Sequence, residues 1–113
     1  MDQKLRMNFR ELLDQEAASL RAEEAATQAD RAPVELDQQS VGRLSRMDAL
    51  QQQAMATAQS RRRAGRLKAI AAALKRLDQD EFGWCDACGD AIPEGRLRLD
   101  PCTLKCVHCA SGR

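Results

Sequence analysis

Apolar side chains recur every three or four positions through the first 29 residues, with Glu and Ala filling many of the intervals and no Gly or Pro among them. This spacing puts the apolar positions on one side of a helix with 3.6 residues per turn. The stripe consists of Leu5, Phe9, Leu12, Leu13 and Leu20. The pattern predicts a helix over residues 1–29. Pro33 predicts a turn over residues 30–36, because proline lacks an amide donor and disfavours helix at the residue before it.

A second and longer stripe predicts a helix over residues 37–80, with Asp37 as its N-cap and Gly83 suited to its C-terminal cap. Its members are Val41, Leu44, Met47, Met55, Ala58, Leu67, Ile70, Leu74 and Leu77. Neither helix can bury its stripe alone, so the short turn favours an antiparallel coiled coil. The first helix is the shorter, and we therefore expect residues 67–80 to pack on whatever follows.

Four cysteines lie near the C-terminus in two Cys-x-x-Cys pairs, Cys85 with Cys88 and Cys106 with Cys109, and 17 residues separate the pairs. Two such pairs can close one tetrahedral shell of four thiolates around zinc. A zinc ion with four protein ligands keeps no open position for water, so we expect one structural zinc and no catalysis. Between the pairs, residues 93–95 predict a turn joining two short extended pieces.

The predicted fold is thus mainly α. It consists of a long antiparallel helical hairpin over residues 1–80, with its tip near 30–37, and a small C4 zinc finger over residues 81–113. We expect Cys102 and His108 to lie outside the metal shell, because four cysteines already complete it. The alternative for Cys102 is a thiol sensor, in which it exchanges with a ligand and releases zinc on oxidation.

Charge is segregated although the net charge is only +1. Residues 61–76 hold 7 basic and no acidic side chains, whereas residues 1–60 hold 7 basic and 10 acidic ones. A candidate basic docking face comprises Arg61, Arg62, Arg63, Arg66 and Lys68. This face is either simply solvated or docks on an acidic rim or a phosphate backbone. A nucleic-acid-binding zinc module is the alternative function that it suggests, with an affinity that falls steeply as salt rises.

Several classes of function are disfavoured by the sequence. No nucleophile–base pair, phosphate loop or open metal site is evident, so we do not expect an enzyme. No apolar run is long enough to span a membrane, and the N-terminus shows no secretory signal. We therefore expect a cytoplasmic protein, in a reducing compartment where paired cysteines bind metal more often than they form disulfides.

The last quarter of the chain closely resembles the zinc-finger signature of the DksA/TraR family of bacterial transcription regulators. The resemblance is carried by Glu81-Phe82-Gly83-Trp84-Cys85, Cys88-Gly89, Ile92, Arg96-Leu97, Pro101, Cys106 and Cys109. The helical hairpin before the finger agrees with that family in architecture. The close match covers about 30 residues.

The resemblance implies a regulator that binds RNA polymerase rather than DNA, inserts its coiled-coil tip into the secondary channel and modulates initiation. It leaves open a joint action with the alarmone ppGpp. The family's tip motif is Asp-x-x-Asp-x-Ala, and Asp30 and Ala32 match its last part, whereas Thr27 stands at its first Asp. Asp37 is an alternative tip carboxylate. We expect a monomer.

Overall fold

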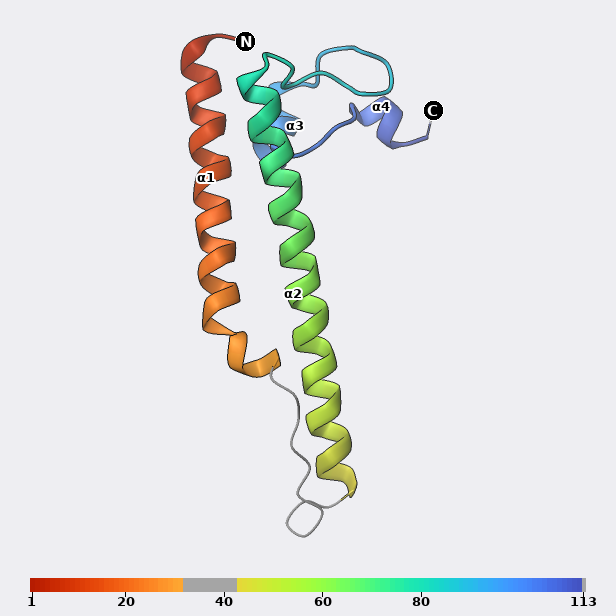
Figure 1. Ribbon diagram of the computed structural model, residues 1–113. Helices are drawn as coiled ribbons and strands as arrows, with labels where there is room; N and C mark the ends of the chain where they lie inside the picture. The colour runs from red at the N-terminus through yellow and green to blue at the C-terminus, as the bar shows by residue number, and fades with distance from the viewer. Residues whose placement is uncertain (32–42, 113) are drawn as a thin grey trace. The chain divides into compact units, whose positions relative to one another are not determined.

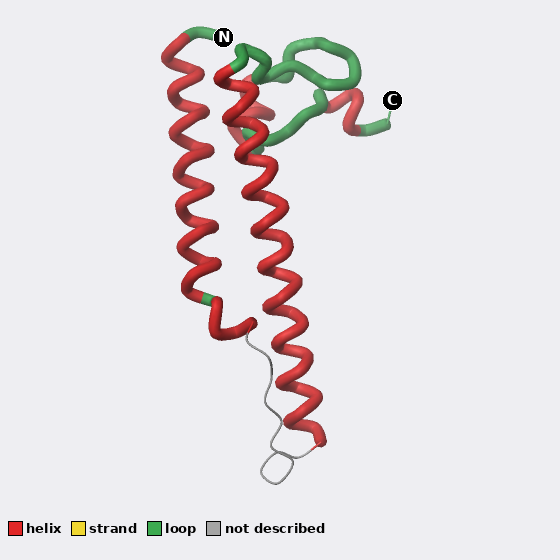
Figure 2. The backbone as a smooth tube through the Cα atoms, viewed as in Figure 1, coloured by secondary structure: helices red, strands yellow, loops and turns green. Residues whose placement is uncertain are grey.

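The computed structural model describes residues 1–31 and 43–112, and these residues are mainly helical (Figure 1). Along the chain lie α1 (Gln3–Ala26), the 3-10 helix η1 (Gln28–Arg31), α2 (Arg43–Asp78), α3 (Glu94–Leu99) and α4 (Val107–Ala110). Over the described ranges there is no strand, only one isolated antiparallel bridge between Trp84 and Ala91 (Figure 2). The predicted mainly helical fold, a hairpin of two long helices followed by a finger, is confirmed.

The helix boundaries differ from the predicted ones for local reasons. α1 begins after Asp2, whose Oδ1 accepts the amide hydrogen of Leu5 at 2.8 Å and so caps the first turn. It ends at Ala26, and the chain turns into η1 through a hydrogen bond from the Asp30 amide to the Thr27 carbonyl at 3.0 Å. Residues 30 and 31 of the turn predicted over 30–36 belong to η1. Its residues 32–36, the predicted N-cap Asp37 and Val41 lie outside the described residues, as does the Leu44 side chain.

The C-terminal cap of α2 is Asp80, not the predicted Gly83. Asp80 adopts the left-handed conformation, with φ of 57°. The Glu81 amide donates to the Arg76 carbonyl at 2.8 Å and the Asp80 amide to the Leu77 carbonyl at 3.4 Å, the two bonds of a Schellman motif. The motif closes three residues before Gly83.

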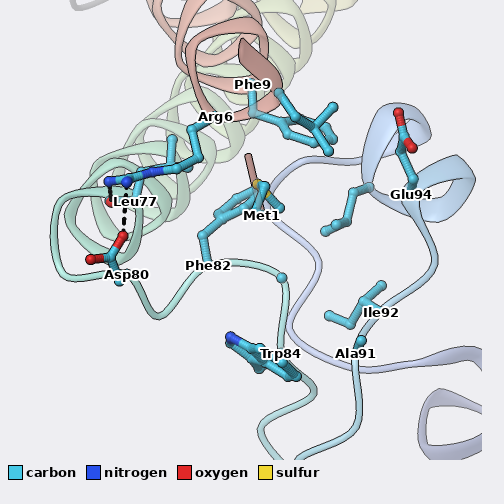
Figure 3. Close-up of a pocket in the computed structure, with 13 residues that line it drawn as sticks. Met1, Arg6, Phe9, Leu77, Asp80, Phe82, Trp84, Ala91, Ile92 and Glu94 are labelled. Carbon is cyan, nitrogen blue, oxygen red and sulfur yellow. Dashed lines mark hydrogen bonds and ion pairs between the residues drawn. The ribbon is translucent and has the colours of Figure 1, made fainter. Parts of the chain in front are cut away.

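Arg6 of α1 completes this cap from across the hairpin (Figure 3). Its Nη2 donates to the Leu77 carbonyl at 2.7 Å, and its Nη1 lies 2.9 Å from Asp80 Oδ1. A carbonyl in the last turn of a helix has no partner within the helix. The Leu77 carbonyl accepts from both the Asp80 amide and the Arg6 guanidinium. One turn further along α1, Arg10 pairs with Asp78.

The chain divides into two compact units, one of Met1–Ala18 with Leu67–Arg113 and one of Ser19–Arg66. The first unit contains every core side chain of the described residues: Phe9, Leu13, Ala17, Ile70, Ala73, Leu77, Phe82, Cys85, Ile92, Leu97 and Cys102. The Phe9 and Phe82 rings lie 5.2 Å apart between centroids. Burial at Phe9, Leu13, Ile70 and Leu77 confirms part of both predicted stripes.

Two expectations about this core need correction. Leu12 was assigned to the buried stripe, but its side chain is 40% exposed, whereas Leu13 is 0% exposed. Residues 67–80 were expected to pack on the finger because the first helix is shorter. They pack against α1 as well, as the bond from Arg6 to Leu77 shows, because α1 starts level with the end of α2.

The second unit is built differently. In its described part, residues 19–31 and 43–66, no residue with a described side chain is fully buried. Of the predicted stripe, Met47 and Met55 are each 57% exposed. Polar contacts between α1, η1 and α2 are prominent here, chief among them the ion pair between Glu24 and Arg63. None of the described helices has the length and apolar character that spanning a membrane requires.

The segment at residues 93–95 is not a turn between extended pieces, as predicted, but the start of α3. Pro93 is the N-cap residue, and its carbonyl accepts the amide hydrogens of Arg96 and Leu97, both at 3.1 Å. Leu97 on this helix is 2% exposed. Proline is tolerated at the start of a helix, where its missing amide is not needed, and burial of Leu97 stabilises the turn that follows.

Candidate metal centre

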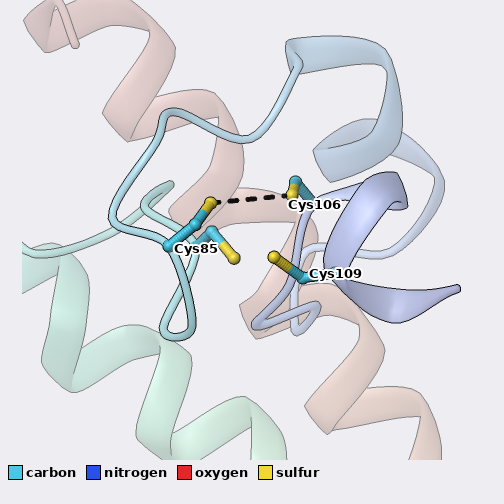
Figure 4. A group of neighbouring side chains, drawn as sticks. Cys85, Cys106 and Cys109 are labelled. Carbon is cyan, nitrogen blue, oxygen red and sulfur yellow. Dashed lines mark hydrogen bonds between the residues drawn. The ribbon is translucent and has the colours of Figure 1, made fainter. Parts of the chain in front are cut away.

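Four cysteine thiols meet in the C-terminal module of the first unit. The sulfurs of Cys85, Cys88, Cys106 and Cys109 all lie within 4.8 Å of one another. Figure 4 shows the Cys85, Cys106 and Cys109 side chains directed toward a common centre. The structure therefore brings together all four predicted ligands, from two segments that are 17 residues apart in the sequence.

Backbone hydrogen bonds shape the first cysteine pair. The Gly89 amide donates to the Cys85 carbonyl at 2.9 Å, and the Cys85 amide donates to the Asp90 carbonyl at 2.8 Å. Gly89 has φ of +78°, a conformation that glycine adopts without steric cost, so the chain can fold back tightly after Cys88. The result is a knuckle with both thiols on one side.

The second pair is set by a short helix. Cys106 is the N-cap residue of α4, and the Ala110 amide donates to its carbonyl at 2.9 Å. Cys109 therefore lies one turn along the same face. The Asp86 amide donates to the Leu104 carbonyl at 2.8 Å and joins the two knuckles directly.

The distances suit tetrahedral zinc. The sulfurs of Cys88 and Cys106 are 3.8 Å apart. With Zn–S bonds of about 2.3 Å, the edge of an S4 tetrahedron is about 3.8 Å. The thiol set therefore fits one structural zinc ion, and the zinc-finger prediction is confirmed. Binding at such sites is worth roughly 10–16 kcal/mol and couples metal loading to folding.

The electrostatics of the four thiols call for a cation. Backbone amides, chiefly that of Cys106 and then that of Cys88, lower the pKa of the Cys85 thiol to about 6. The neighbouring sulfur of Cys106, followed by those of Cys85 and Cys88, raises the pKa of Cys109 to about 12. Thiolates packed this closely repel one another, so a full set of four requires a dication at their centre.

Cys102 and His108 lie outside the cluster of four thiols, in agreement with the prediction. Cys102 is 9% exposed, and its amide donates to Asp100 Oδ1 at 3.0 Å. His108 lies on α4 and is exposed. Cys102 thus contributes to the buried core of the first unit.

A hollow of about 400 Å³ lies where α1, the end of α2 and the finger meet (Figure 3). Its walls are largely apolar, with Phe9, Phe82 and Ile92 buried and Trp84 55% exposed. Arg6 and Glu94 add charge to the lining. Gly83, with φ of +91°, allows the chain to pass close to Leu97 here.

The other predicted site residues belong to the hairpin. Asp30 is exposed on η1, and the remaining tip candidates Ala32 and Asp37 lie outside the described residues. Arg61, Arg62 and Lys68 are exposed. The side chain of Arg63 is only 12% exposed and contacts Glu24, and Arg66 is half-buried, so these two point away from a common outer face.

Sequence reasoning missed Glu24, which binds Ser60 and Arg63 across the hairpin. A pairing of this kind depends on the register of two helices, and the exposed pattern of charges in each helix alone carries no signal for it. The basic cluster around residue 63 was the only available indication that a carboxylate from elsewhere would meet it.

Comparisons with known proteins agree with this geometry. Residues 80–113 match the family model of the prokaryotic DksA/TraR C4-type zinc finger. The RNA polymerase-binding transcription factor DksA of Haemophilus influenzae is 46% identical over 43 residues, which are 38% of this chain and 30% of that protein. An uncharacterized protein of Aquifex aeolicus is 41% identical over 44 residues, 39% of this chain and 30% of its own length.

The matched part of the chain thus spans under a third of the length of these curated relatives. A solved structure of the transcription factor DksA2 from Pseudomonas aeruginosa superimposes with a TM-score of 0.80 over 99% of this chain and 84% of that one, at 24% identity. That likeness extends the shared fold to the hairpin. The chain therefore carries a DksA/TraR C4-type zinc finger over residues 80–113 and shares the fold of that solved structure.

Proposed function

We propose that this protein is a non-catalytic transcription regulator that binds RNA polymerase, inserts the hairpin into the secondary channel and modulates initiation. The family's zinc finger at residues 80–113 is the observation that supports this most strongly. The relative from Haemophilus influenzae is named for binding RNA polymerase. The helical hairpin with the fold of a transcription factor adds to the case.

The working carboxylate in this proposal is Asp30. It is exposed on η1, at the end of α1 and beside the segment that links the two long helices. An ionised carboxylate at this place can approach a bound metal ion or a mobile cationic element of the polymerase. Ala32, the alanine of the matched motif, is the tip contact proposed beside Asp30, and Asp37 remains the alternative tip carboxylate.

The exposed cations Arg61, Arg62 and Lys68 have a proposed part in docking. No acidic residue occurs in residues 61–76, so these side chains lie in a stretch of uniform charge. Such a stretch favours an acidic rim on the polymerase and accelerates the encounter at low salt. We propose that the protein acts as a cytoplasmic monomer without binding DNA directly.

The test is binding and transcription with purified core polymerase. Co-migration measures binding, and in vitro transcription from one ribosomal and one amino-acid promoter, with and without ppGpp, measures output. We expect Asp30→Asn to abolish the effect on initiation while binding persists. Asp37→Asn tests the rival tip residue in the same assay.

Asp14→Asn is the matched control, since Asp14 is an exposed acid in α1 within the first unit. It should leave both binding and output unchanged. Absence of polymerase binding by the unmodified protein would reject the proposal. So would unchanged output from the protein that carries Asp30→Asn and Asp37→Asn together.

A further inference from the structure

Five polar side chains join α1, η1 and α2 inside the second unit. We call them the Glu24 cluster, and its members are Glu24, Thr27, Arg31, Ser60 and Arg63. Glu24 lies in the last turn of α1, Thr27 at the junction with η1, and Arg31 at the end of η1. Ser60 and Arg63 are one turn apart on α2 and share a face.

The carboxylate of Glu24 is the centre of this cluster. Its Oε1 lies 3.0 Å from Arg63 Nε and 2.9 Å from Arg63 Nη2, and its Oε2 accepts the Ser60 hydroxyl at 2.6 Å. Arg31 Nη2 lies 3.3 Å from the same Oε2. The hydrogen bond from Ser60, followed by that from Arg63, lowers the pKa of Glu24 below its ordinary value. Oε1 is thus bound from α2, and Oε2 is bound from both α2 and η1.

Thr27 links the same two guanidinium groups a second time. Its Oγ1 accepts from Arg31 Nη1 at 3.0 Å and from Arg63 Nη2 at 3.0 Å. The hydroxyl itself donates to the Glu23 carbonyl at 2.8 Å, and Arg31 Nη2 donates to the Glu24 carbonyl at 3.2 Å. The Glu23 carbonyl also accepts the Thr27 amide at 3.0 Å, so the hydroxyl adds a second bond there. The bond from Arg31 ties η1 to a carbonyl in the last turn of α1.

The surroundings of this cluster make its hydrogen bonds important for holding η1 to α2. In residues 19–31 and 45–66 no side chain is fully buried, so packing alone holds η1 to α2 weakly. The Arg63 and Arg31 side chains are shielded, at 12% and 19% exposed. Charge-assisted hydrogen bonds in such a place are stronger than exposed ion pairs, and here they bridge three elements.

We propose that Glu24 and Arg63 are positioning residues: they hold η1 against α2 and thereby determine how Asp30 is presented. Asp30 precedes Arg31 in the chain, and its amide donates to the carbonyl of Thr27. Both Arg31 and Thr27 are members of the Glu24 cluster. The part of this inference that concerns Asp30 in transcription rests on the proposed function. The part that concerns the holding of η1 stands on the contacts alone.

The first experiment measures hydrogen exchange of the amides of residues 27–31 in the full zinc-loaded protein. We expect Glu24→Gln, and separately Arg63→Met, to speed exchange there by about tenfold, because each removes charge-assisted bonds. Glu23→Gln and Arg62→Met are the matched controls, since both are exposed neighbours of the same residue type. Amides of the first unit, such as that of Leu13, should keep their rates in all four variants. Unchanged exchange in Glu24→Gln and Arg63→Met would overturn the inference.

The second experiment is a double-mutant comparison in the transcription assay. Glu24→Gln should weaken the effect on output while binding to core polymerase persists, and it should cause no further change in a protein that already carries Asp30→Asn. Independent effects of the two substitutions would refute the link to Asp30. If the unmodified protein does not bind polymerase, the proposed function fails, whereas the exchange experiment still decides whether the cluster holds η1.

Discussion

Two adjacent leucines of α1 provide a strict test of the packing described here. Leu13 is 0% exposed and Leu12 is 40% exposed, although both were assigned to the same stripe from the sequence. The substitutions Leu13→Ala and Leu12→Ala change the same atoms in the same helix and gain the same small helix propensity. Any difference in their effect on stability therefore reports burial.

The expected magnitudes follow from burial. Removing a fully buried leucine side chain to Ala costs about 2–5 kcal/mol, because the transfer free energy is lost and a cavity remains. We expect about 3 kcal/mol for Leu13→Ala. At Leu12 the side chain is partly in water already and solvent fills the space that it leaves, so we expect about 1 kcal/mol or less.

Urea unfolding of the zinc-loaded protein checks this prediction, with the fluorescence of Trp84 as the probe of the first unit. Trp84 is the only tryptophan in the chain. With a denaturant dependence of about 1.5 kcal/mol per M, Leu13→Ala should lower the midpoint by about 2 M and Leu12→Ala by well under 1 M. Equal shifts for the two variants would show that α1 does not present Leu13 to the core in the way described.

Three further predictions concern the cap of α2, the zinc ligands, and the dependence of the core on zinc. Asp80→Gly should stabilise the protein by about 0.5–1 kcal/mol in thermal unfolding, because glycine adopts the left-handed conformation freely and the lost ion pair with Arg6 is exposed; a loss as large as that of Asp80→Ala would contradict this. Cys102→Ser should retain one zinc per chain by metal analysis while Cys106→Ser loses it, and zinc loss from both would place Cys102 in the shell. Chelation of zinc should lower the urea midpoint reported by Trp84, and added zinc should restore it, since the finger supplies Phe82 to the core. A midpoint that does not change with zinc would show that the finger does not stabilise that core.

The cysteines show how much local sequence can determine. Each Cys-x-x-Cys pair is a short-range unit, because two intervening residues are enough for one knuckle to direct both sulfurs to one side. Structural zinc is almost always held by four ligands in a tetrahedron, so two such knuckles complete one site. The metal site, and the mainly helical nature of the hairpin, were therefore predictable from spacing and periodicity, and the structure agrees on both.

The cap of α2, the exposure of Leu12 and the Glu24 cluster were decided only by the tertiary structure. Each depends on the register between helices: Arg6 reaches Leu77 and Asp80, and Glu24 reaches Arg63, because α1 and α2 align at particular turns. Periodicity locates a stripe to within about one residue on either side, whereas burial distinguishes Leu13 from its neighbour. Contacts between residues far apart in the chain form only in the folded state, and no local pattern in the sequence records them.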